Sequence, residues 1–186
     1  MKESRCQGGL TIWLTGMSGA GKTTIANVLK DKFAELKHET LVIDGDFVRS
    51  SINKKLGFSK EDIVTNNRSI IELCLVARKQ YDFVIVPVIS PFLEIRAEAK
   101  DILGPQFLEV FVKCDIESLS VRDTKGLYAQ ERQGLINNLI GVSRGSPYEP
   151  PMNPDVVLNS GKESVLESVN KLMEKVMSIK DLGQTT

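Results

Sequence analysis

The chain has 186 residues, a length that predicts one domain large enough to bury a hydrophobic core. Lysine plus arginine and aspartate plus glutamate number 24 each, so the chain lacks the basic excess that binds nucleic acid nonspecifically. No apolar stretch reaches membrane-spanning length and no secretory segment is recognisable, so we expect a cytoplasmic protein without nucleic-acid or membrane partners. The cysteines, Cys6, Cys74 and Cys114, lack metal-ligand spacing, and we expect the last two to be buried, reduced thiols.

Predicted strands and helices alternate along the chain. Strands are expected over residues 10–15, 40–44, 83–90, 107–112 and 155–159. Helices are expected over residues 22–37, 47–56, 59–79, 94–103, 116–122 and 162–179. This alternation is typical of an α/β protein, and we expect a doubly wound, mostly parallel five-stranded sheet flanked by helices. Pro87 has no N–H for a sheet ladder, so it must lie where its strand ends or bulges.

The stretch 123–153 differs from the rest of the chain. It is rich in glycine, asparagine, proline and charge, and it shows little periodicity. A connection of this length is usually either functional or disordered, and we expect a lid or binding loop. We find no internal repeat and no second domain, so residues 1–186 are expected to form a single domain with a frayed tail over residues 180–186.

A phosphate-binding loop follows the first predicted strand. The segment Gly16-Met17-Ser18-Gly19-Ala20-Gly21-Lys22-Thr23 has the glycine, four-residue, Gly-Lys-Thr spacing of such loops. Its glycines let successive N–H groups turn toward an anion, and the helix beginning near Lys22 directs its positive dipole end to the same place. We expect Lys22 to contact the β- and γ-phosphates of ATP and Thr23 to ligate Mg²⁺. The alternative is a glycine-rich turn that only joins a strand to a helix.

Two carboxylates follow the second predicted strand, at the edge of the sheet where ligands collect in folds of this type. Asp44 and Asp46 flank a glycine, so one can hold Mg²⁺ while the other orients or deprotonates an attacking hydroxyl. The alternative for Asp46 is that it only caps the following helix. Arg49, one turn on, is expected to bind a phosphate or sulfate oxygen pair, or else to be a solvated helix residue. The single histidine, His38, lies among charges at a predicted helix end, so we expect no histidine base.

The remaining candidates are weak when taken one at a time. Phe58 is either a base-stacking platform or a core residue, and Arg68 is either an anion ligand or a surface residue. Lys125, Tyr128 and Arg132 in the long loop are expected to close over phosphate charge, unless they are simply solvated.

Several of these motifs occur together, and in this order, in one family. They are Gly16 to Thr24, Ile43-Asp44-Gly45-Asp46 with Arg49, Asn53-Lys54-Lys55-Leu56-Gly57-Phe58-Ser59, Ile89-Ser90-Pro91, Lys125-Gly126-Leu127-Tyr128 and Ser146-Pro147-Tyr148-Glu149. Through them the chain resembles the adenylylsulfate (APS) kinases over about residues 10–160, which is nearly the whole domain. The phosphate loop alone is shared by many nucleotide-binding proteins, whereas the combination is much more specific.

The resemblance implies transfer of the γ-phosphate of ATP, with Mg²⁺, to the ribose 3′-hydroxyl of adenosine 5′-phosphosulfate (APS), by a protein that is usually a homodimer. It implies that the catalytic residues are Lys22, Asp44, Asp46, Lys125 and Ser90, the last at a position where some members carry a phosphoserine. The implied ATP contacts are Gly16, Ser18, Gly19, Ala20, Gly21, Lys22, Thr23, Thr24 and Arg122, and the implied metal contacts are Thr23 and Asp44. The implied acceptor contacts are Asp46, Arg49, Phe58, Asn66, Arg68, Ile89, Ser90, Lys125, Gly126, Leu127 and Leu139. Phosphoryl transfer depends mostly on positioning and charge neutralisation, so it needs no histidine.

The chain departs from the family pattern on the acceptor side. Ile63, Ser69 and Leu93 stand where the family usually has arginines, and Leu139 stands where a phenylalanine would face Phe58 across the base. Two extra residues lie around 144–145. Losing a base–aromatic stack costs about 1–3 kcal/mol. Two alternatives therefore stay open: the same chemistry on a related nucleotide, such as a cytidine diphosphoramidate-like derivative in capsule synthesis, and a nucleotide-binding protein without catalysis.

Overall fold

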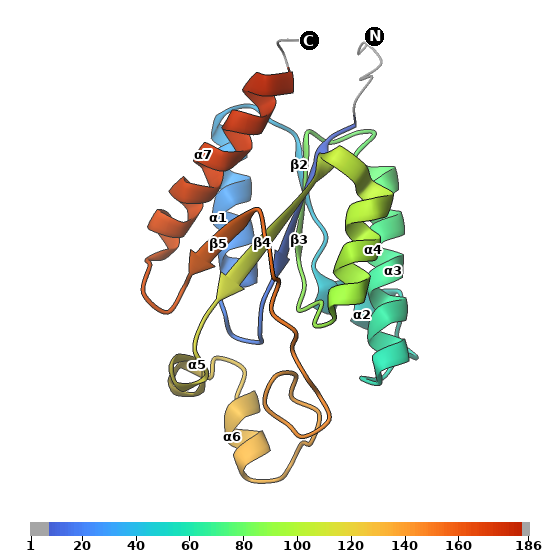
Figure 1. Ribbon diagram of the computed structural model, residues 1–186, viewed down its shortest axis with the longest axis vertical. Helices are drawn as coiled ribbons and strands as arrows, with labels where there is room; N and C mark the ends of the chain where they lie inside the picture. Colours follow the sequence, from blue (N-terminus) through green and yellow to red (C-terminus); the bar gives the residue numbers. More distant parts are fainter. Residues whose placement is uncertain (1–7, 184–186) are drawn as a thin grey trace.

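Five strands form one parallel sheet in the middle of the molecule, in the spatial order β2-β3-β1-β4-β5 (Figure 1). The structure is a computed structural model that describes residues 8–183. The strands are β1 (Leu10–Thr15), β2 (Thr40–Val42), β3 (Phe83–Pro87), β4 (Phe107–Lys113) and β5 (Val156–Asn159). The sequence predicted a mostly parallel sheet, and every pairing between these strands is parallel.

Helices cover both faces of the sheet, as the doubly wound fold requires. The helices are α1 (Lys22–Glu35), α2 (Gly45–Ser51), α3 (Lys60–Ala77), α4 (Leu93–Leu103), α5 (Ile116–Arg122), α6 (Leu127–Arg132) and α7 (Val165–Gly183), with a 3-10 turn η1 (Gly104–Gln106). α1 and α7 pack on one face, and α3 and α4 pack on the other (Figure 1). The predicted α/β fold class is therefore confirmed.

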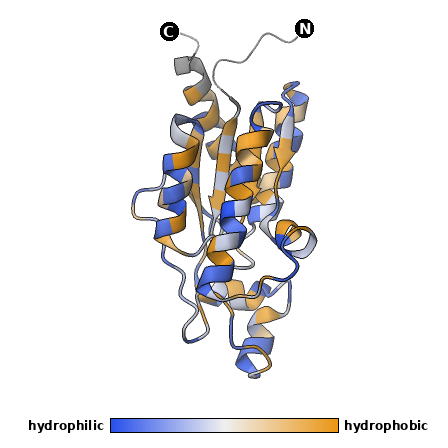
Figure 2. Ribbon diagram, turned by 90° about the vertical axis from the view of Figure 1, so that its right-hand side faces the viewer, coloured by the Kyte–Doolittle hydropathy of each residue, from blue (hydrophilic) through white to orange (hydrophobic). Residues whose placement is uncertain are grey.

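The alternating side chains of the strands feed two separate cores. Ile12 and Leu14 of β1 join the cluster that packs with α1 and α7, whereas Trp13 joins the cluster that packs with α3 and α4. Because both faces are covered, the strands are apolar almost throughout, whereas hydrophilic and hydrophobic residues alternate along the helices (Figure 2). Each fully buried leucine, isoleucine or phenylalanine side chain contributes about 1.5–3 kcal/mol relative to its exposed state.

All five strands point to the same edge of the sheet, at the lower end of Figure 1, where α5, α6 and the long loop also lie. Pro87 is the last residue of β3, so its missing N–H interrupts no ladder bond, as the sequence predicted. The next amide, that of Val88, donates to the carbonyl of Leu14 at 3.1 Å. His38 lies at the opposite end of the sheet, with its ring 5.2 Å from that of Phe83 at the start of β3.

Several predicted boundaries were wrong. β2 ends at Val42 and β3 at Pro87. The next amides, those of Ile43 and Val88, still donate to strand carbonyls at 2.9 and 3.1 Å, and the chain leaves the sheet after them. Residues 127–132 form α6 inside the stretch 123–153, where the sequence showed no helical periodicity. α7 continues to Gly183, so residues 180–183 are helical and not a frayed tail, and residues 184–186 lie outside the described residues.

The two described cysteines are free thiols. Cys74 is fully buried on α3, and this burial raises the pKa of its thiol to about 12, so it is a buried thiol as predicted. Cys114 is only half-buried, because it lies in the turn after β4, where the strand leaves the core. Cys6 lies outside the described residues.

Candidate active site

The phosphate-binding loop connects β1 to α1 at the carboxyl edge of the sheet. A Cβ atom on Gly16 would lie 2.4 Å from the carbonyl oxygen of Val112, so only glycine fits beside β4 at this position. Gly21 precedes α1 with a φ of 93°, a left-handed conformation that glycine adopts without strain. The ammonium group of Lys22 donates to the carbonyl oxygens of Gly16 and Met17, both at 2.8 Å. The strand–loop–helix context that the motif requires is therefore present.

Asp44 has two functions, one for each carboxylate oxygen. Oδ1 accepts hydrogen bonds from the amides of Asp46 and Phe47, at 2.9 and 3.3 Å, and so caps α2. Oδ2 accepts a hydrogen bond from the hydroxyl of Thr23 at 3.1 Å. The cap fixes the carboxylate and directs its second oxygen toward the phosphate loop. The sequence had predicted that this helix begins at Phe47. It begins at Gly45 because Asp44 caps it there.

Asp46 does not cap the helix, so the structural alternative considered for it is wrong. Its Oδ2 lies 2.6 Å from the ammonium nitrogen of Lys125, in a pair whose side chains are 56% exposed for the lysine and 70% for the aspartate. An exposed pair of this kind adds little stability, because water screens the two charges. Both groups are therefore available to a ligand at small energetic cost.

Two cavities meet at this ion pair. The first, of about 190 Å³, is lined by Ser18, Gly19, Gly21, Lys22, Thr23, Thr24, Asp44, Asp46, Pro87, Val88, Ile89, Thr124 and Lys125. The second, of about 440 Å³, is lined by Ser18, Asp46, Arg49, Ser50, Lys54, Phe58, Ile89, Lys125, Leu127, Ile136, Asn138, Leu139 and Ile140. The residues common to both linings are Ser18, Asp46, Ile89 and Lys125. The site thus has a phosphate compartment and a larger, more apolar compartment, with a carboxylate and an ammonium group at their junction.

One wall of the second cavity is built by the segment between α2 and α3. The guanidinium of Arg49 lies 4.9 Å from the ring centroid of Phe58 and donates a hydrogen bond to the carbonyl of Gly57. Partial burial lowers the pKa of Arg49 from its ordinary value, although the group stays a cation at neutral pH. The ring of Phe58 is 55% exposed, so this residue belongs to the cavity wall and not to the core. Leu139 also lines this cavity.

The segment around α6 is held down by hydrogen bonds near the phosphate loop. The carboxylate of Asp123 caps α6 by accepting from the amides of Tyr128 and Ala129, at 3.0 and 2.8 Å. The hydroxyl of Tyr128 donates to the carbonyl of Ser18 at 2.8 Å, and burial raises the pKa of this hydroxyl to about 12. Tyr128 is therefore a buried anchor of the segment, so the alternative that it is simply solvated is wrong. Arg132 lines neither cavity.

Besides Gly16 and Ala20 of the phosphate loop, five predicted site residues line neither cavity. Asn66 is buried and accepts from the side-chain amide of Asn53 at 3.0 Å, and Arg68 forms a two-point ion pair with Glu98 at 2.8 and 2.9 Å. Ser90 is fully buried, and its hydroxyl has no hydrogen-bond partner among the described residues, which gives its predicted catalytic role no support. The others, Gly126 and Arg122, lie beside the site: the first precedes α6, and the second donates to the carbonyl of Ser160 at 2.6 Å.

The second cavity also contains residues that the sequence did not single out as ligands. They are Ser50, Lys54, Ile136, Asn138 and Ile140. Ser50 directly follows Arg49, and Asn138 directly precedes Leu139. Their position next to predicted contacts is the feature of the sequence that could have identified them. No periodicity in the stretch 123–153 indicated that Ile136 would turn inward.

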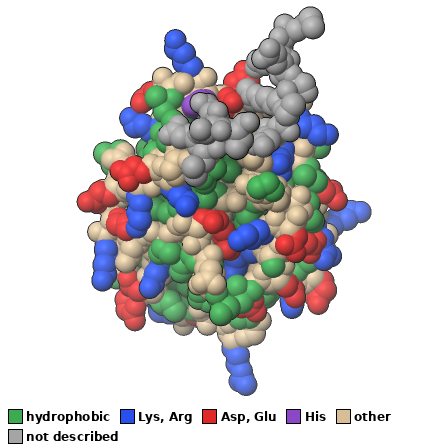
Figure 3. Space-filling view, turned by 45° about the horizontal axis from the view of Figure 1, so that its top comes forward, with side chains coloured by type: hydrophobic (Ala, Val, Ile, Leu, Met, Phe, Trp, Pro, Cys, Tyr) green, Lys and Arg blue, Asp and Glu red, His purple; other side chains and the backbone are tan. Residues whose placement is uncertain are grey.

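Lysine, arginine, aspartate and glutamate side chains are interspersed on the face drawn in Figure 3. Within the part of the chain that the structure describes, no helix has the length and apolar character needed to cross a membrane.

Comparison with known proteins gives one consistent result. The family profile described as "Adenylylsulphate kinase" matches residues 8–159. A probable adenylyl-sulfate kinase of Synechocystis sp. is 45% identical over 94% of this chain and 97% of the relative. An adenylyl-sulfate kinase of Gloeothece citriformis is 45% identical over 91% of this chain and 95% of the relative. The chain belongs to the adenylylsulfate kinase family.

Solved structures of the adenylylsulfate kinase family agree with the fold described above. The structure of the Mycobacterium tuberculosis APS kinase in complex with AMPPNP and APS has a TM-score of 0.86 to this chain. It is 35% identical in sequence, and the match covers 91% of this chain and 98% of that one. The resemblance drawn from the motifs is therefore confirmed.

The departures from the adenylylsulfate kinase pattern have definite places in the structure. Ile63 is 5% exposed and belongs to the core beneath α3, so an apolar side chain occupies the position of a family arginine. Leu93 is the first residue of α4 and is 38% exposed. The inserted residues 144–145 lie in a turn closed by a hydrogen bond of 2.7 Å from the Gly141 amide to the Ser146 carbonyl.

We expect kcat/KM for ATP to fall as the pH rises through about 8. Burial is the largest cause of the low pKa of Lys22, which is about 8; Lys125 lowers it further, and Asp46 and Asp44 oppose both effects. Below this pH the ammonium group carries the charge that attracts the phosphates, and above it the amine is neutral. Bound phosphates raise the pKa of the lysine, so kcat at saturating ATP should decline only at higher pH.

The measurement is a pH profile of initial rates between about pH 7 and about pH 9, at low and at saturating ATP. In a Lys125→Gln variant, whatever its absolute rate, the inflection of kcat/KM should move to higher pH, because a neighbouring cation has been removed. A profile for ATP that stays flat through this range would contradict the assignment.

Proposed function

We propose that this protein is a Mg²⁺- and ATP-dependent kinase that phosphorylates the ribose 3′-hydroxyl of APS and so forms 3′-phosphoadenosine 5′-phosphosulfate. The observation that carries the proposal is the junction of the two cavities, which share Asp46 and Lys125. The first compartment contains the phosphate-binding loop, which suits a nucleoside triphosphate. The second contains an aromatic ring and cations, which suit a second nucleotide. A kinase for a nucleotide acceptor needs both compartments, with a carboxylate where they meet.

The phosphate compartment would hold ATP. The amides of the loop, together with the positive end of α1, attract the phosphates, and Lys22 would leave its own loop carbonyls to bind the β- and γ-phosphates. The oxygens of Thr23 and Asp44, 3.1 Å apart, are hard donors of the type that Mg²⁺ prefers, and these two residues would hold the ion. When bound, Mg²⁺ neutralises charge on the β- and γ-phosphates. By the family resemblance Arg122, whose guanidinium donates to the carbonyl of Ser160, would also contact ATP.

The transfer step uses the junction. In the proposed reaction the 3′-oxygen forms a bond to the γ-phosphorus as the bond from that phosphorus to the bridging oxygen of ADP breaks. Asp46 orients the 3′-hydroxyl and accepts its proton, and Lys125 leaves Asp46 to neutralise charge on the transferring group. Because the present ion pair is exposed, exchanging Asp46 for the phosphoryl oxygens costs Lys125 little.

The second compartment would bind the acceptor. Phe58 presents an exposed ring for stacking on the base, with Arg49 beside it for an anionic group. The named relatives favour adenylylsulfate as the acceptor. The specific observation in favour of the cytidine alternative is that Ile63 and Leu139 replace an arginine and an aromatic ring of the family pattern.

The decisive experiment is ADP release by the purified full chain with Mg²⁺ and ATP, measured as kcat/KM for APS and for cytidine diphosphate derivatives. We expect clear preference for APS. Preference for a cytidine nucleotide would show that the acceptor is the cytidine derivative and not APS. Stabilisation by nucleotide, without turnover of any acceptor in the panel, would favour a non-catalytic binding protein.

We expect the Phe58→Ala variant to raise KM for APS by about 5–150-fold, the range that corresponds to a base–aromatic stack of about 1–3 kcal/mol. The KM for ATP should stay unchanged, because Phe58 lines only the acceptor cavity. Phe47→Ala is the matched control, since Phe47 is an exposed phenylalanine on the neighbouring α2 that lines neither cavity. Equal effects of the two substitutions on KM for APS would show that Phe58 does not stack on the base.

We further propose that residues 123–153 act as a lid within a single domain, with Lys125, Gly126 and Leu127 closing over the bound acceptor. The support is that this segment contributes residues to both cavities and is anchored to the phosphate loop through Tyr128. On the basis of the family resemblance we also propose that the protein forms a homodimer. On the basis of the sequence we propose a cytoplasmic location. Size-exclusion chromatography with light scattering tests the first.

A further inference from the structure

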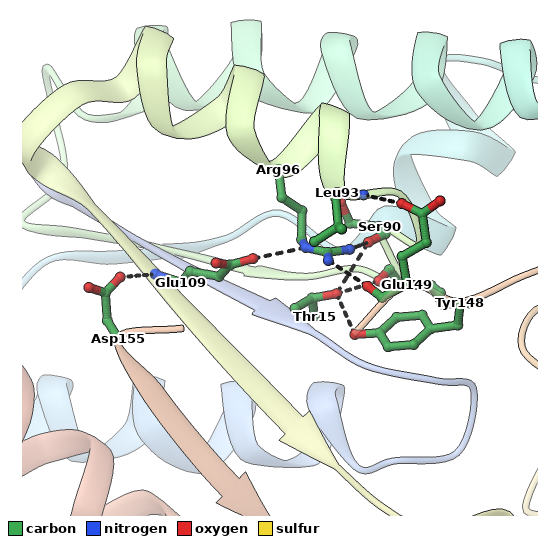
Figure 4. Close-up of polar contacts among 9 residues, drawn as sticks. Thr15, Ser90, Leu93, Arg96, Glu109, Tyr148, Glu149 and Asp155 are labelled. Atoms are coloured by element: carbon green, nitrogen blue, oxygen red, sulfur yellow. Dashed lines mark hydrogen bonds and ion pairs between the residues drawn. The ribbon is translucent and has the colours of Figure 1, made fainter. Parts of the chain in front are cut away.

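A buried polar cluster connects the wall shared by the two cavities to the end of the lid segment (Figure 4). Its centre is Arg96 of α4, a side chain that is only 2% exposed. Its guanidinium donates three hydrogen bonds: to the carboxylate of Glu109 on β4 at 2.8 Å, to the carbonyl of Ser90 at 2.5 Å, and to the carbonyl of Glu149 at 2.5 Å. One side chain therefore joins three segments that are distant in sequence.

A second set of contacts closes the same cluster from the side of β1. The hydroxyl of Thr15, the last residue of β1, donates to the carbonyl of Ile89 at 2.6 Å and lies 3.0 Å from the hydroxyl of Tyr148. The ring of Tyr148 in turn faces Arg96, with its centroid 5.9 Å from the guanidinium carbon (Figure 4). Burial raises the pKa of the Tyr148 hydroxyl to about 12, so this group stays protonated through the physiological range.

Glu149 fixes the end of the lid segment to the residues after β3 at two further points. Its amide donates to the carbonyl of Pro91 at 2.8 Å, and its carboxylate accepts from the amide of Leu93 at 2.7 Å. Together with the bond from Arg96, these contacts make residues 89–93 and 148–149 one hydrogen-bonded unit.

This unit matters for the site because Ile89 lines both cavities. The following residue, Ser90, has a φ of 44°, a conformation that costs energy for any residue with a side chain and persists only where the surroundings impose it. The bonds that its carbonyl accepts from Arg96 and, at 3.3 Å, from Thr15 supply that constraint. Arg96 itself lines neither cavity.

We propose that Arg96 is a positioning residue for the acceptor: it holds the Ile89–Ser90 backbone and the end of the lid in one geometry, and so fixes the wall against which the acceptor binds. The inference depends on the proposed function only in taking the second cavity as the acceptor site. Its effect should fall on the acceptor side, because the hydrogen bonds that Arg96 makes go to Ser90, Glu109 and Glu149 and not to the phosphate loop.

The test is the double variant Arg96→Met/Glu109→Gln. Replacing Arg96 alone would leave the Glu109 carboxylate buried without its partner, whereas the double variant removes both charges and is expected to fold. We expect KM for the acceptor to rise about 10–100-fold, because a displaced wall makes poorer contact with the bound acceptor and so weakens its binding. The KM for ATP should change less than about twofold. The acceptor used is whichever nucleotide the unmodified protein phosphorylates best, so a changed substrate assignment does not decide the outcome.

Arg78→Met is the matched control. Arg78 also holds a backbone carbonyl, that of Leu103 at 2.8 Å, but it lies at the C-terminal end of α3, away from both cavities. This variant should lose thermal stability without a selective change in KM for the acceptor. An unchanged acceptor KM in the folded double variant, or an equal rise in the Arg78→Met control, would overturn the proposal.

Amide hydrogen exchange gives a readout that needs no turnover. In the double variant, the amides of Leu93 and Glu149 should exchange faster together, because Arg96 no longer holds the two segments as one unit. Exchange at Gly19 and Lys22 of the phosphate loop should be unchanged. If neither amide, or only one of them, loses protection, Arg96 does not couple the two segments and the inference is wrong.

Discussion

Replacing Asp46 by asparagine is expected to lower kcat by about 10²–10⁴-fold, the usual contribution of a positioned general base. Asparagine keeps the size of the side chain but cannot accept the proton of the acceptor hydroxyl. The carboxylate lies at the junction of both cavities and caps no helix, so its loss should leave α2 intact, since Asp44 makes that cap. Initial rates of ADP release with saturating ATP, Mg²⁺ and APS give the value.

The same variant should still bind ATP, which a thermal shift with a non-hydrolysable analogue can show. Asp101→Asn is the matched control, because Asp101 is an exposed aspartate on α4 that lines neither cavity, and its rate should equal that of the unmodified protein. Asp46 also raises the pKa of Lys22, so in Asp46→Asn the inflection of kcat/KM for ATP should move to lower pH. An Asp46→Asn protein with full turnover would remove Asp46 from the mechanism.

The second large effect is expected for Lys22→Met, which keeps most of the length of the side chain but removes its charge. We expect kcat/KM for ATP to fall on the order of 10²–10³-fold, the usual cost of losing one preorganised group that stabilises charge in the transition state. The folded protein should tolerate the change, because among the described residues the hydrogen bonds lost are those from Lys22 to the carbonyls of Gly16 and Met17. Steady-state kinetics with varied ATP measure the effect.

Lys30→Met on the same helix is the control, since Lys30 is exposed and lines neither cavity. Comparable melting temperatures for the two variants would establish that the lost rate is not a loss of folded protein. A Lys22→Met variant with the kinetics of the Lys30 control would contradict the assignment of the phosphate loop.

The phosphate loop and the fold class could be predicted because they depend on short stretches of contiguous sequence. A strand, a glycine-rich turn and a helix place Lys22 and Thr23 by local geometry, and alternation of apolar strands with helices specifies a parallel sheet. The motif order was also specific enough to identify the family. The predicted ends of some elements, such as β3 and α7, were wrong because pairing and packing decide where an element stops.

The acceptor side could be predicted only in part. Phe58 and Leu139 line the cavity as expected, but Asn66, Arg68 and Ser90 do not, because Asn53, Glu98 and the buried turn engage them instead. These partners come from other elements, and no spacing in the sequence indicates them. The same holds for α6, whose cap by Asp123 depends on a turn that periodicity does not detect.

The sequence by itself determined the fold class, the family and the phosphate-binding loop, because each depends on short motifs or patterns whose residues are neighbours along the chain. Only the tertiary structure decided which of two nearby aspartates caps a helix and which is left for chemistry. It also brought Arg96, Glu109 and Glu149 from three separate segments into one buried cluster behind the acceptor wall. The physical reason is that burying an unpaired charge lowers the stability of the fold. A buried charge therefore pairs with groups that lie near it in the folded core, whatever their distance along the chain.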